Sequence, residues 1–176
     1  GGIEGVAKAK AELVASLPNS GTAVLNADDE RVLAMSAIAS GAVVTYGQHG
    51  DVTPTEVQFD AFGRARFRFD SPWGSASVAL QVAGEHMMSN ALAAIAVGGV
   101  LKVSLKEIVD GLEAVEPEDH RMVVHELESG SLLIDDCYNA NPTSVVAALR
   151  TLADLDVIRR IAVLGEMAEV DEPVAA

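Results

Sequence analysis

The sequence predicts an α/β protein, in which a parallel sheet covered by helices carries a small antiparallel meander and is followed by the start of a second α/β unit. Three observations support this fold class. Apolar residues with helical spacing alternate with short apolar runs over residues 3–46. The pattern changes to strand-like alternation over residues 55–82, and the helical spacing returns from residue 84. Helices that alternate with strands are typical of a parallel sheet.

A helix, a strand, a second helix and a second strand are expected in that order at the start of the chain. Apolar spacings of three and four predict a helix over residues 3–17, which Pro18-Asn19-Ser20-Gly21 ends. Residues 22–25 predict a strand, and Asn26-Ala27-Asp28-Asp29 offers side chains that cap the next helix. The second strand is predicted over residues 43–46.

The middle of the chain predicts an antiparallel meander attached to the main sheet, followed by two helices. Residues 55–82 are rich in aromatic and β-branched side chains, with turns at Phe62-Gly63-Arg64 and at residues 71–75. We interpret the aromatic side chains as packing residues, because the surrounding charge does not suit nucleic acid. Helices are expected over residues 84–100, with Gly98-Gly99 weakening the pattern, and over residues 104–115.

A linker and a second, Rossmann-like unit are expected after these helices. The acidic run from Glu113 to Asp119 contains a proline and marks a change in composition. Residues 122–127 and 131–134 predict a hairpin, and residues 143–154 predict a helix. A final strand is predicted over residues 160–165.

The turn Asp135-Asp136-Cys137-Tyr138-Asn139-Ala140-Asn141-Pro142 is the strongest candidate for a ligand site. It follows the apolar run Leu132-Leu133-Ile134, which predicts a buried strand, and Thr143 or Ser144 can cap the helix after it. Ligands gather at such strand-to-helix turns because backbone N–H groups and the helix dipole point outward there. A capped, asparagine-rich turn without a ligand is the alternative interpretation.

Composition limits the function classes. The formal net charge of −14 argues against binding to a nucleic-acid backbone or an anionic membrane. The single cysteine, Cys137, fits a reducing compartment, and we expect a cytoplasmic protein with no membrane span. Gly1-Gly2 leads into a helical pattern without an initiator methionine, so we expect the chain to derive from a longer one. No phosphate loop, Ser-His-Asp order or Cys/His metal spacing appears in the sequence.

Five stretches in the correct order give the chain its resemblance to the Mur ligase family of peptidoglycan synthesis. They are residues 6–13 (VAKAKAEL), 24–29 (VLNADD), 84–94 (GEHMMSNALAA), 135–142 (DDCYNANP) and 163–169 (VLGEMAE). The resemblance implies the later part of the family's central ATP-binding domain over residues 1–116 and the beginning of its C-terminal ligase domain over residues 117–176. It also implies that the N-terminal domain, the phosphate loop and most of the C-terminal domain are missing.

The resemblance implies an ATP-dependent amide ligase with ATP and Mg²⁺ as cofactors. The stretches at 138–142 and 163–169 are similar to those of family members that add D-Ala-D-Ala to UDP-N-acetylmuramoyl-tripeptide. The implied reaction activates a carboxylate as an acyl phosphate, which the amine of D-Ala-D-Ala attacks. Without the phosphate loop we expect this chain alone to show no turnover and at most weak nucleotide binding.

Two site residues are implied before the linker. Lys10 matches the lysine that the family carbamylates, and a carbamate is an anion able to hold Mg²⁺. Asn90 matches an asparagine that contacts adenine. His86 lies four residues earlier on the same helical face, where it either shapes the site or is a satisfied structural histidine. The family often has asparagine in place of Met87.

The remaining implied residues follow the linker. Arg121 matches an arginine on the ATP phosphates, although the family commonly has glycine where this chain has His120. Asp136 matches the aspartate that bonds the ribose hydroxyls, while Asp135 supports the turn. Tyr138 and Asn141 are expected close to the nucleotide.

These assignments predict that ATP binds between two lobes, with Asn90 from one and Asp136 from the other. Two alternatives stay open: another amide ligase of the superfamily, similar to folylpolyglutamate synthetase, and a non-catalytic nucleotide-binding or interaction module.

Overall fold

The computed structural model describes residues 2–167, which fold into two compact units. The first unit consists of the residues up to 57 together with 67–78 and 89–112. The second consists of 58–66, 79–88 and the residues from 113 onward. No helix among the described residues combines the length and the apolar character that crossing a lipid bilayer requires.

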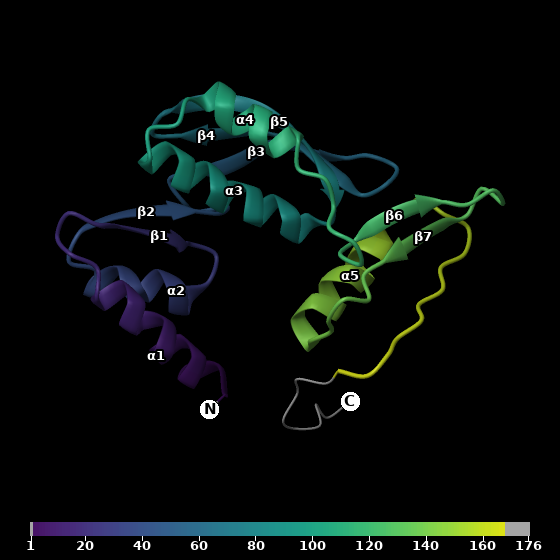
Figure 1. Cartoon of the computed structure of the whole chain (residues 1–176), viewed down its shortest axis with the longest axis horizontal. Coiled ribbons are helices and arrows are strands. Elements are labelled where there is room, and N and C mark those ends of the chain that lie inside the picture. The colour runs from purple at the N-terminus through teal and green to yellow at the C-terminus, as the bar shows by residue number, and fades with distance from the viewer. Residues whose placement is uncertain (1, 168–176) are drawn as a thin grey trace. The chain divides into compact units, whose positions relative to one another are not determined.

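The first unit opens with the predicted order of helices and parallel strands (Figure 1). Strands β1 and β2 are parallel, in a register that runs from Thr22 opposite Ala42 to Asn26 opposite Tyr46. Asp29 caps α2 by accepting hydrogen bonds from the backbone N–H groups of Arg31 and Val32. The elements are α1 (Gly2–Ala15), β1 (Thr22–Asn26), α2 (Glu30–Ala34), the 3-10 helix η1 (Met35–Ile38) and β2 (Ala42–Tyr46).

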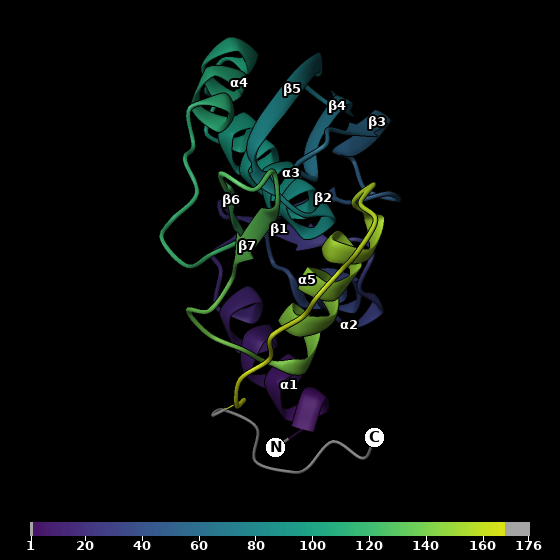
Figure 2. The same ribbon diagram turned by 90° about the vertical axis from the view of Figure 1, so that its right-hand side faces the viewer.

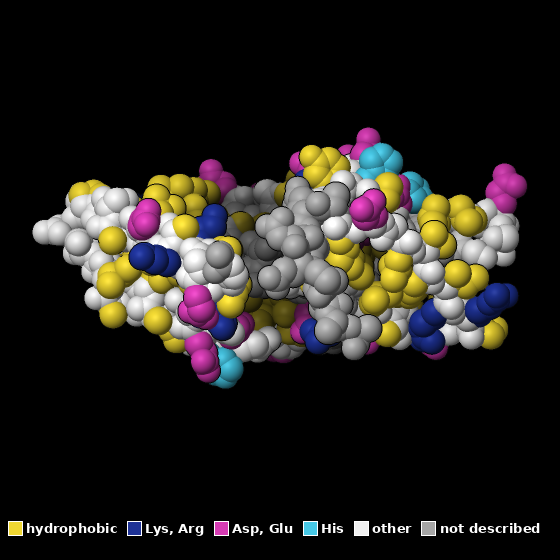
Figure 3. Space-filling model, turned by 90° about the horizontal axis from the view of Figure 1, so that it is seen from below, with side chains coloured by type: hydrophobic (Ala, Val, Ile, Leu, Met, Phe, Trp, Pro, Cys, Tyr) yellow, Lys and Arg dark blue, Asp and Glu magenta, His cyan; other side chains and the backbone are white. Residues whose placement is uncertain are grey.

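A small core joins these elements. It consists of the buried residues Val14, Ala23, Leu25 and Met35. The predicted apolar face of α1 is only partly buried, because Ile3, Val6 and Leu13 are 53–70% exposed. Hydrophobic side chains are visible on the face of the molecule seen from below (Figure 3).

The meander forms a sheet of its own, with strand order β3-β4-β5. Its strands are joined by short turns, which only antiparallel neighbours allow. Phe67 and Phe69 of β4 are almost fully buried, as expected of packing residues. Helix α3 lies along one face of this sheet (Figures 1 and 2). The elements are β3 (Thr53–Phe59), β4 (Arg64–Ser71), β5 (Gly74–Ala83), α3 (Glu85–Val100) and α4 (Leu105–Glu113).

Gly98 and Gly99 do not end α3, which continues to Val100. A Cβ atom at Gly99 would overlap the ring of Trp73, and one at Gly98 would lie 2.8 Å from side-chain carbons of Ile108. The two glycines therefore allow Trp73 and α4 to approach α3 closely, which offsets their low helix propensity.

The second unit contains the predicted hairpin and helix. Strands β6 (Val123–Glu126) and β7 (Leu132–Asp135) are antiparallel, with Val123 opposite Asp135. Helix α5 (Pro142–Asp154) lies beside the hairpin in both ribbon views (Figures 1 and 2). Its residue Thr151 and the following Leu155 are buried, and both approach Gly63.

Two expectations for this unit are wrong, and a third lies partly outside the described residues. Leu133 is 49% exposed, so β7 is a half-buried hairpin strand and not the buried strand that the run Leu132–Ile134 predicted. Residues 160–165 form no strand, because no strand of the described residues pairs with them, and Ile161, Val163 and Leu164 are exposed. The end of the matched stretch 163–169, from residue 168, lies outside the described residues.

Candidate functional site

The candidate site is the turn that joins β7 to α5. Strand β7 ends at Asp135, and α5 begins at Pro142. The helix cap is Asn141, not Thr143 or Ser144: its side chain accepts the backbone N–H of Ser144 at 2.9 Å, and its own N–H donates to Ser144 Oγ at 3.1 Å. This reciprocal pair fixes the start of the helix and gives Asn141 a structural task.

Asp136 is the half-buried carboxylate of the turn. Its Oδ1 accepts the backbone N–H of Met122 at 3.1 Å, which joins the turn to the residues before β6. Burial raises the pKa of Asp136, while that N–H and the nearby His86 and Arg121 oppose the rise. The carboxylate of Asp136 can accept further hydrogen bonds, because the two oxygens of an ionised carboxylate accept about four in total.

Arg121 lies over the ring of Tyr138, with its guanidinium carbon 4.0 Å from the ring centroid. It also pairs with Glu118 at 3.3 Å. The backbone N–H of Tyr138 donates to the His120 carbonyl at 3.1 Å, so the two segments are joined by their main chains as well. The side chains of Arg121 and Tyr138 are both more than half exposed, so the guanidinium donors are accessible to an anion.

His120 occupies a backbone conformation that favours glycine, with φ +62°. Its Nδ1 is 2.8 Å from Asp135 Oδ2, and this hydrogen bond raises the pKa of His120. The same bond lowers the pKa of Asp135, and the hydrogen bond of Cys137 to Asp135 raises the pKa of the thiol.

His86, at the start of α3, packs against the backbone of Gly84. A Cβ atom at Gly84 would lie 2.6 Å from His86 Cε1 and 3.4 Å from Thr151 Oγ1. Burial lowers the pKa of His86, and the charge of Asp136 opposes that shift. Within residues 2–167 its Nδ1 is buried without a hydrogen-bond partner. This nitrogen therefore keeps a hydrogen-bonding position for a ligand or a water molecule.

The second unit also has an open pocket of about 600 Å³ between the meander and the hairpin. Its lining includes Arg64 but also Glu113, Glu116 and Glu126. Three carboxylates disfavour a triphosphate, so the nucleotide is not assigned to this pocket.

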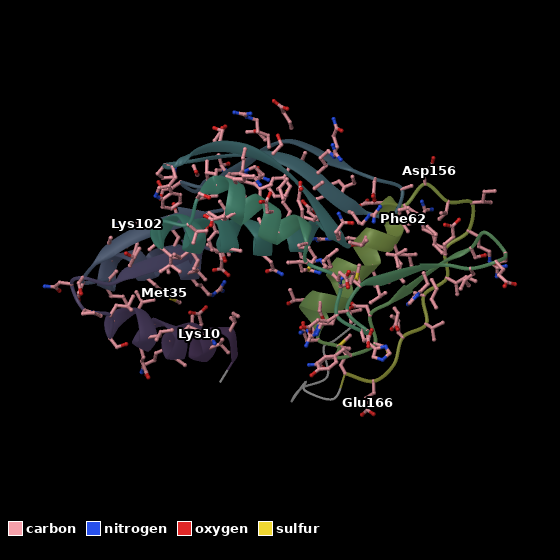
Figure 4. The ribbon with its side chains drawn as sticks, turned by 45° about the horizontal axis from the view of Figure 1, so that its top comes forward. Lys10, Met35, Phe62, Lys102, Asp156 and Glu166 are labelled. Carbon is pink, nitrogen blue, oxygen red and sulfur yellow. The ribbon has the colours of Figure 1, made fainter. Side chains whose placement is uncertain are left out.

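The predicted site residues are divided between the two units. His86, Arg121, Asp136, Tyr138 and Asn141 all belong to the second unit, where His86 and Arg121 both act on the charge of Asp136. Lys10 on α1 (Figure 4) and Asn90 on α3 belong to the first unit and are exposed. That all of them meet at one nucleotide stays a prediction.

The residues present fit a nucleotide and, after one modification, a magnesium ion. The buried His86 Nδ1 lacks a partner among the described residues, and Arg121 offers accessible donors for phosphate. Unmodified Lys10 is a cation and repels Mg²⁺, so it suits the ion only as a carbamate. Sequence reasoning missed the roles of His120 and Cys137, since only the left-handed backbone at His120 brings its imidazole to Asp135.

Comparison with known families gives two matches. The Mur ligase middle domain matches residues 1–98, and the Mur ligase, glutamate ligase domain matches residues 120–175.

Individual relatives agree with these matches. The UDP-N-acetylmuramoyl-tripeptide--D-alanyl-D-alanine ligase of Mycobacterium tuberculosis is 41% identical over 184 residues, covering 100% of this chain and 36% of that protein. The enzyme of the same name from Escherichia coli is 36% identical over 174 residues, covering 97% and 38%. A crystal structure of MurF from Acinetobacter baumannii matches with a TM-score of 0.79 and 36% identity, over 85% of this chain and 33% of that one. The chain thus spans little more than a third of the length of these curated relatives.

Proposed function

Because this chain belongs to the Mur ligase family, we propose that it is part of an ATP-dependent ligase that adds D-Ala-D-Ala to UDP-N-acetylmuramoyl-tripeptide in peptidoglycan synthesis. The observation that carries the proposal is the turn after β7, where Asp136 and the stacked pair of Arg121 and Tyr138 lie together. The 41% identity to a ligase of that name over the whole chain supports the choice of substrates.

The residues of the second unit have distinct proposed roles. Asp136 accepts hydrogen bonds from the ribose hydroxyls, because an ionised carboxylate is an acceptor only. Arg121 binds phosphate oxygens through its fork of donors, and the ring of Tyr138 holds the guanidinium in place. His86 supplies its unpaired Nδ1 to the same site, either to the nucleotide or to a water molecule.

The first unit supplies the other contacts in this proposal. Asn90 offers a donor and an acceptor to the adenine edge. Lys10, once carbamylated, holds Mg²⁺, which neutralises the charge of the phosphates when it is bound. The nucleotide is then enclosed by both units. The carboxylate of the tripeptide takes the terminal phosphoryl group of ATP, which releases ADP. The amine of D-Ala-D-Ala then displaces inorganic phosphate from the acyl phosphate and forms the amide. We infer a cytoplasmic site of action, because the substrate is linked to a nucleotide.

The test is a ligase assay on the whole protein that contains this chain. We expect phosphate release only when ATP, UDP-N-acetylmuramoyl-tripeptide and D-Ala-D-Ala are all present. Asp136→Asn is expected to raise the KM for ATP about 10- to 100-fold, since a hydrogen bond to a charged group contributes about 1.5–3 kcal/mol. Asp154→Asn, a matched change at an exposed position of α5, is expected to leave the KM unchanged.

Two other outcomes would favour a different function, and a third would refute the role given to Asp136. Phosphate release with glutamate in place of D-Ala-D-Ala would favour a ligase similar to folylpolyglutamate synthetase. Nucleotide binding without phosphate release under any substrate combination would favour a non-catalytic module. An equal KM in the Asp136→Asn variant would refute the assigned role of this carboxylate.

A further inference from the structure

Three side chains of different chemistry converge beside the turn after β7. They are His120, Asp135 and Cys137, and one ligand atom from each lies within 4.8 Å of the other two. His120 precedes β6, Asp135 ends β7, and Cys137 follows two residues later. All three belong to the second unit, so the cluster does not depend on the position of the first.

The backbone holds this cluster together. Antiparallel pairing places Val123 opposite Asp135, which brings the start of β6 to the end of β7. Tyr138 directly follows Cys137 in the chain, and its backbone N–H donates to the carbonyl of His120 at 3.1 Å. His120 Nδ1 is 2.8 Å from Asp135 Oδ2, and the N–H of Cys137 donates to Asp135 Oδ1 at 3.4 Å. The carboxylate is thus oriented by both of its partners.

Asp135 and Asp136 serve different purposes. The carboxylate of Asp136 accepts the N–H of Met122, whereas that of Asp135 pairs with His120. None of the three clustered side chains is used in the proposed nucleotide contacts, so the cluster has no task in the proposed function.

We propose that His120, Asp135 and Cys137 form a binding site for a thiophilic divalent metal ion of the zinc class. An imidazole nitrogen, a carboxylate oxygen and a thiolate sulfur are the ligands that Zn²⁺ takes, whereas Mg²⁺ and Ca²⁺ prefer oxygen alone. Three protein ligands leave the fourth tetrahedral position to water. The thiol releases its proton when the ion binds.

The distances suit such an ion after a small adjustment. Bond lengths of about 2.0–2.3 Å place the ligand atoms of a tetrahedral site about 3.3–3.7 Å apart. The 2.8 Å pair of His120 and Asp135 must therefore open, with the ion replacing the proton between them. His120 and Cys137 are exposed, so their side chains can move without disturbing a core.

Zinc binding to the chain tests the proposal. We expect one Zn²⁺ per chain by titration calorimetry, with micromolar or tighter affinity. Cys137→Ser, Asp135→Asn and His120→Gly are each expected to weaken binding at least tenfold. His120→Gly suits the backbone, because φ +62° favours glycine, so this variant removes the ligand without strain. His125→Gln changes an exposed histidine on β6 and is expected to shift the affinity less than twofold.

A second measurement separates ligation from loss of folding. Cys137 is the only cysteine of the chain, so bound Co²⁺ should give a thiolate charge-transfer absorption that belongs to this residue alone. Zn²⁺ should also slow alkylation of Cys137 at least tenfold in the unmodified chain and in His125→Gln, but not in His120→Gly. No zinc binding up to millimolar concentration would overturn the proposal, and so would binding that is unchanged in His120→Gly or that leaves the alkylation rate unaltered.

Discussion

Replacing Gly98 of α3 by alanine is expected to destabilise the first unit by about 1 kcal/mol. The new Cβ atom would lie 2.8 Å from Cγ1 and Cδ1 of Ile108, whereas ordinary contacts begin at 3.4 Å. Ile108 is 8% exposed and cannot swing into solvent, so α3 and α4 must separate. Such overpacking costs about 1–3 kcal/mol. The higher helix propensity of alanine stabilises α3 by about 1 kcal/mol and so offsets part of this cost.

Gly111 of α4 provides the matched control, because a Cβ atom there meets nothing within 4 Å. Gly111→Ala is expected to stabilise the unit by about 1 kcal/mol through propensity alone. Urea unfolding followed by the fluorescence of Trp73, the only tryptophan, reports on the first unit. In an Ile108→Ala background the clash disappears, so Gly98→Ala should become stabilising as well. If Gly98→Ala stabilises the unmodified chain as much as Gly111→Ala does, the claim that α3 and α4 pack closely at Gly98 is refuted.

Three further predictions concern a helix cap, the core and pH. Asn141→Ala should cost about 1 kcal/mol of stability in denaturant unfolding followed by circular dichroism, because the side-chain oxygen that accepts the Ser144 N–H is lost. An unchanged midpoint would contradict this. Phe69→Ala should cost about 3–5 kcal/mol, and Phe59→Ala, at an exposed position, about 0.5 kcal/mol or less, so equal losses would contradict the assigned core. The hydrogen bond between the two side chains raises the pKa of His120 and lowers that of Asp135, so this pairing stabilises fully between about pH 4 and pH 6.5. It is lost as pH rises through the raised pKa of His120 or falls through the lowered pKa of Asp135. Asp135→Asn should return the pKa of His120 toward about 6.5 in an NMR titration, and an unaltered titration would exclude the pairing.

Local patterns were sufficient for most helices and strands. Apolar spacing predicted α1 and α3, and the glycine and proline breaks predicted the meander and the β6–β7 hairpin. Such elements depend on the period of the side chains and on turn chemistry, which are properties of neighbouring residues.

The structure differs from the sequence-based expectations where contacts with residues distant in sequence determine the local structure. The two glycines of α3 predicted a weak point, but they are contact positions for Trp73 and Ile108, which no local pattern reveals. Residues 160–165 have a strand-like composition, yet a strand also needs a neighbour with which to exchange hydrogen bonds. The exposed Leu133 shows the same dependence, because burial is set by what covers a side chain.

The candidate site was predictable as a turn but not as a set of contacts. The order of strand, carboxylates, amides and proline indicated the turn after β7 and its helix. Composition cannot show that Arg121 stacks on Tyr138, or that His120 reaches Asp135 from a left-handed backbone position. Both contacts join segments that the hairpin brings together. The roles of Lys10 and Asn90 stay predictions.

The division of the chain into units has a consequence for its cleavage by proteases. The polypeptide passes from one unit to the other at residues 57/58, 66/67, 78/79, 88/89 and 112/113. A cut within residues 113–119 would leave residues 58–66 on one fragment and α5 on the other, although Thr151 and Leu155 pack close to Gly63. The nicked protein should therefore elute from a sizing column as one particle under native conditions and separate into two bands only in detergent.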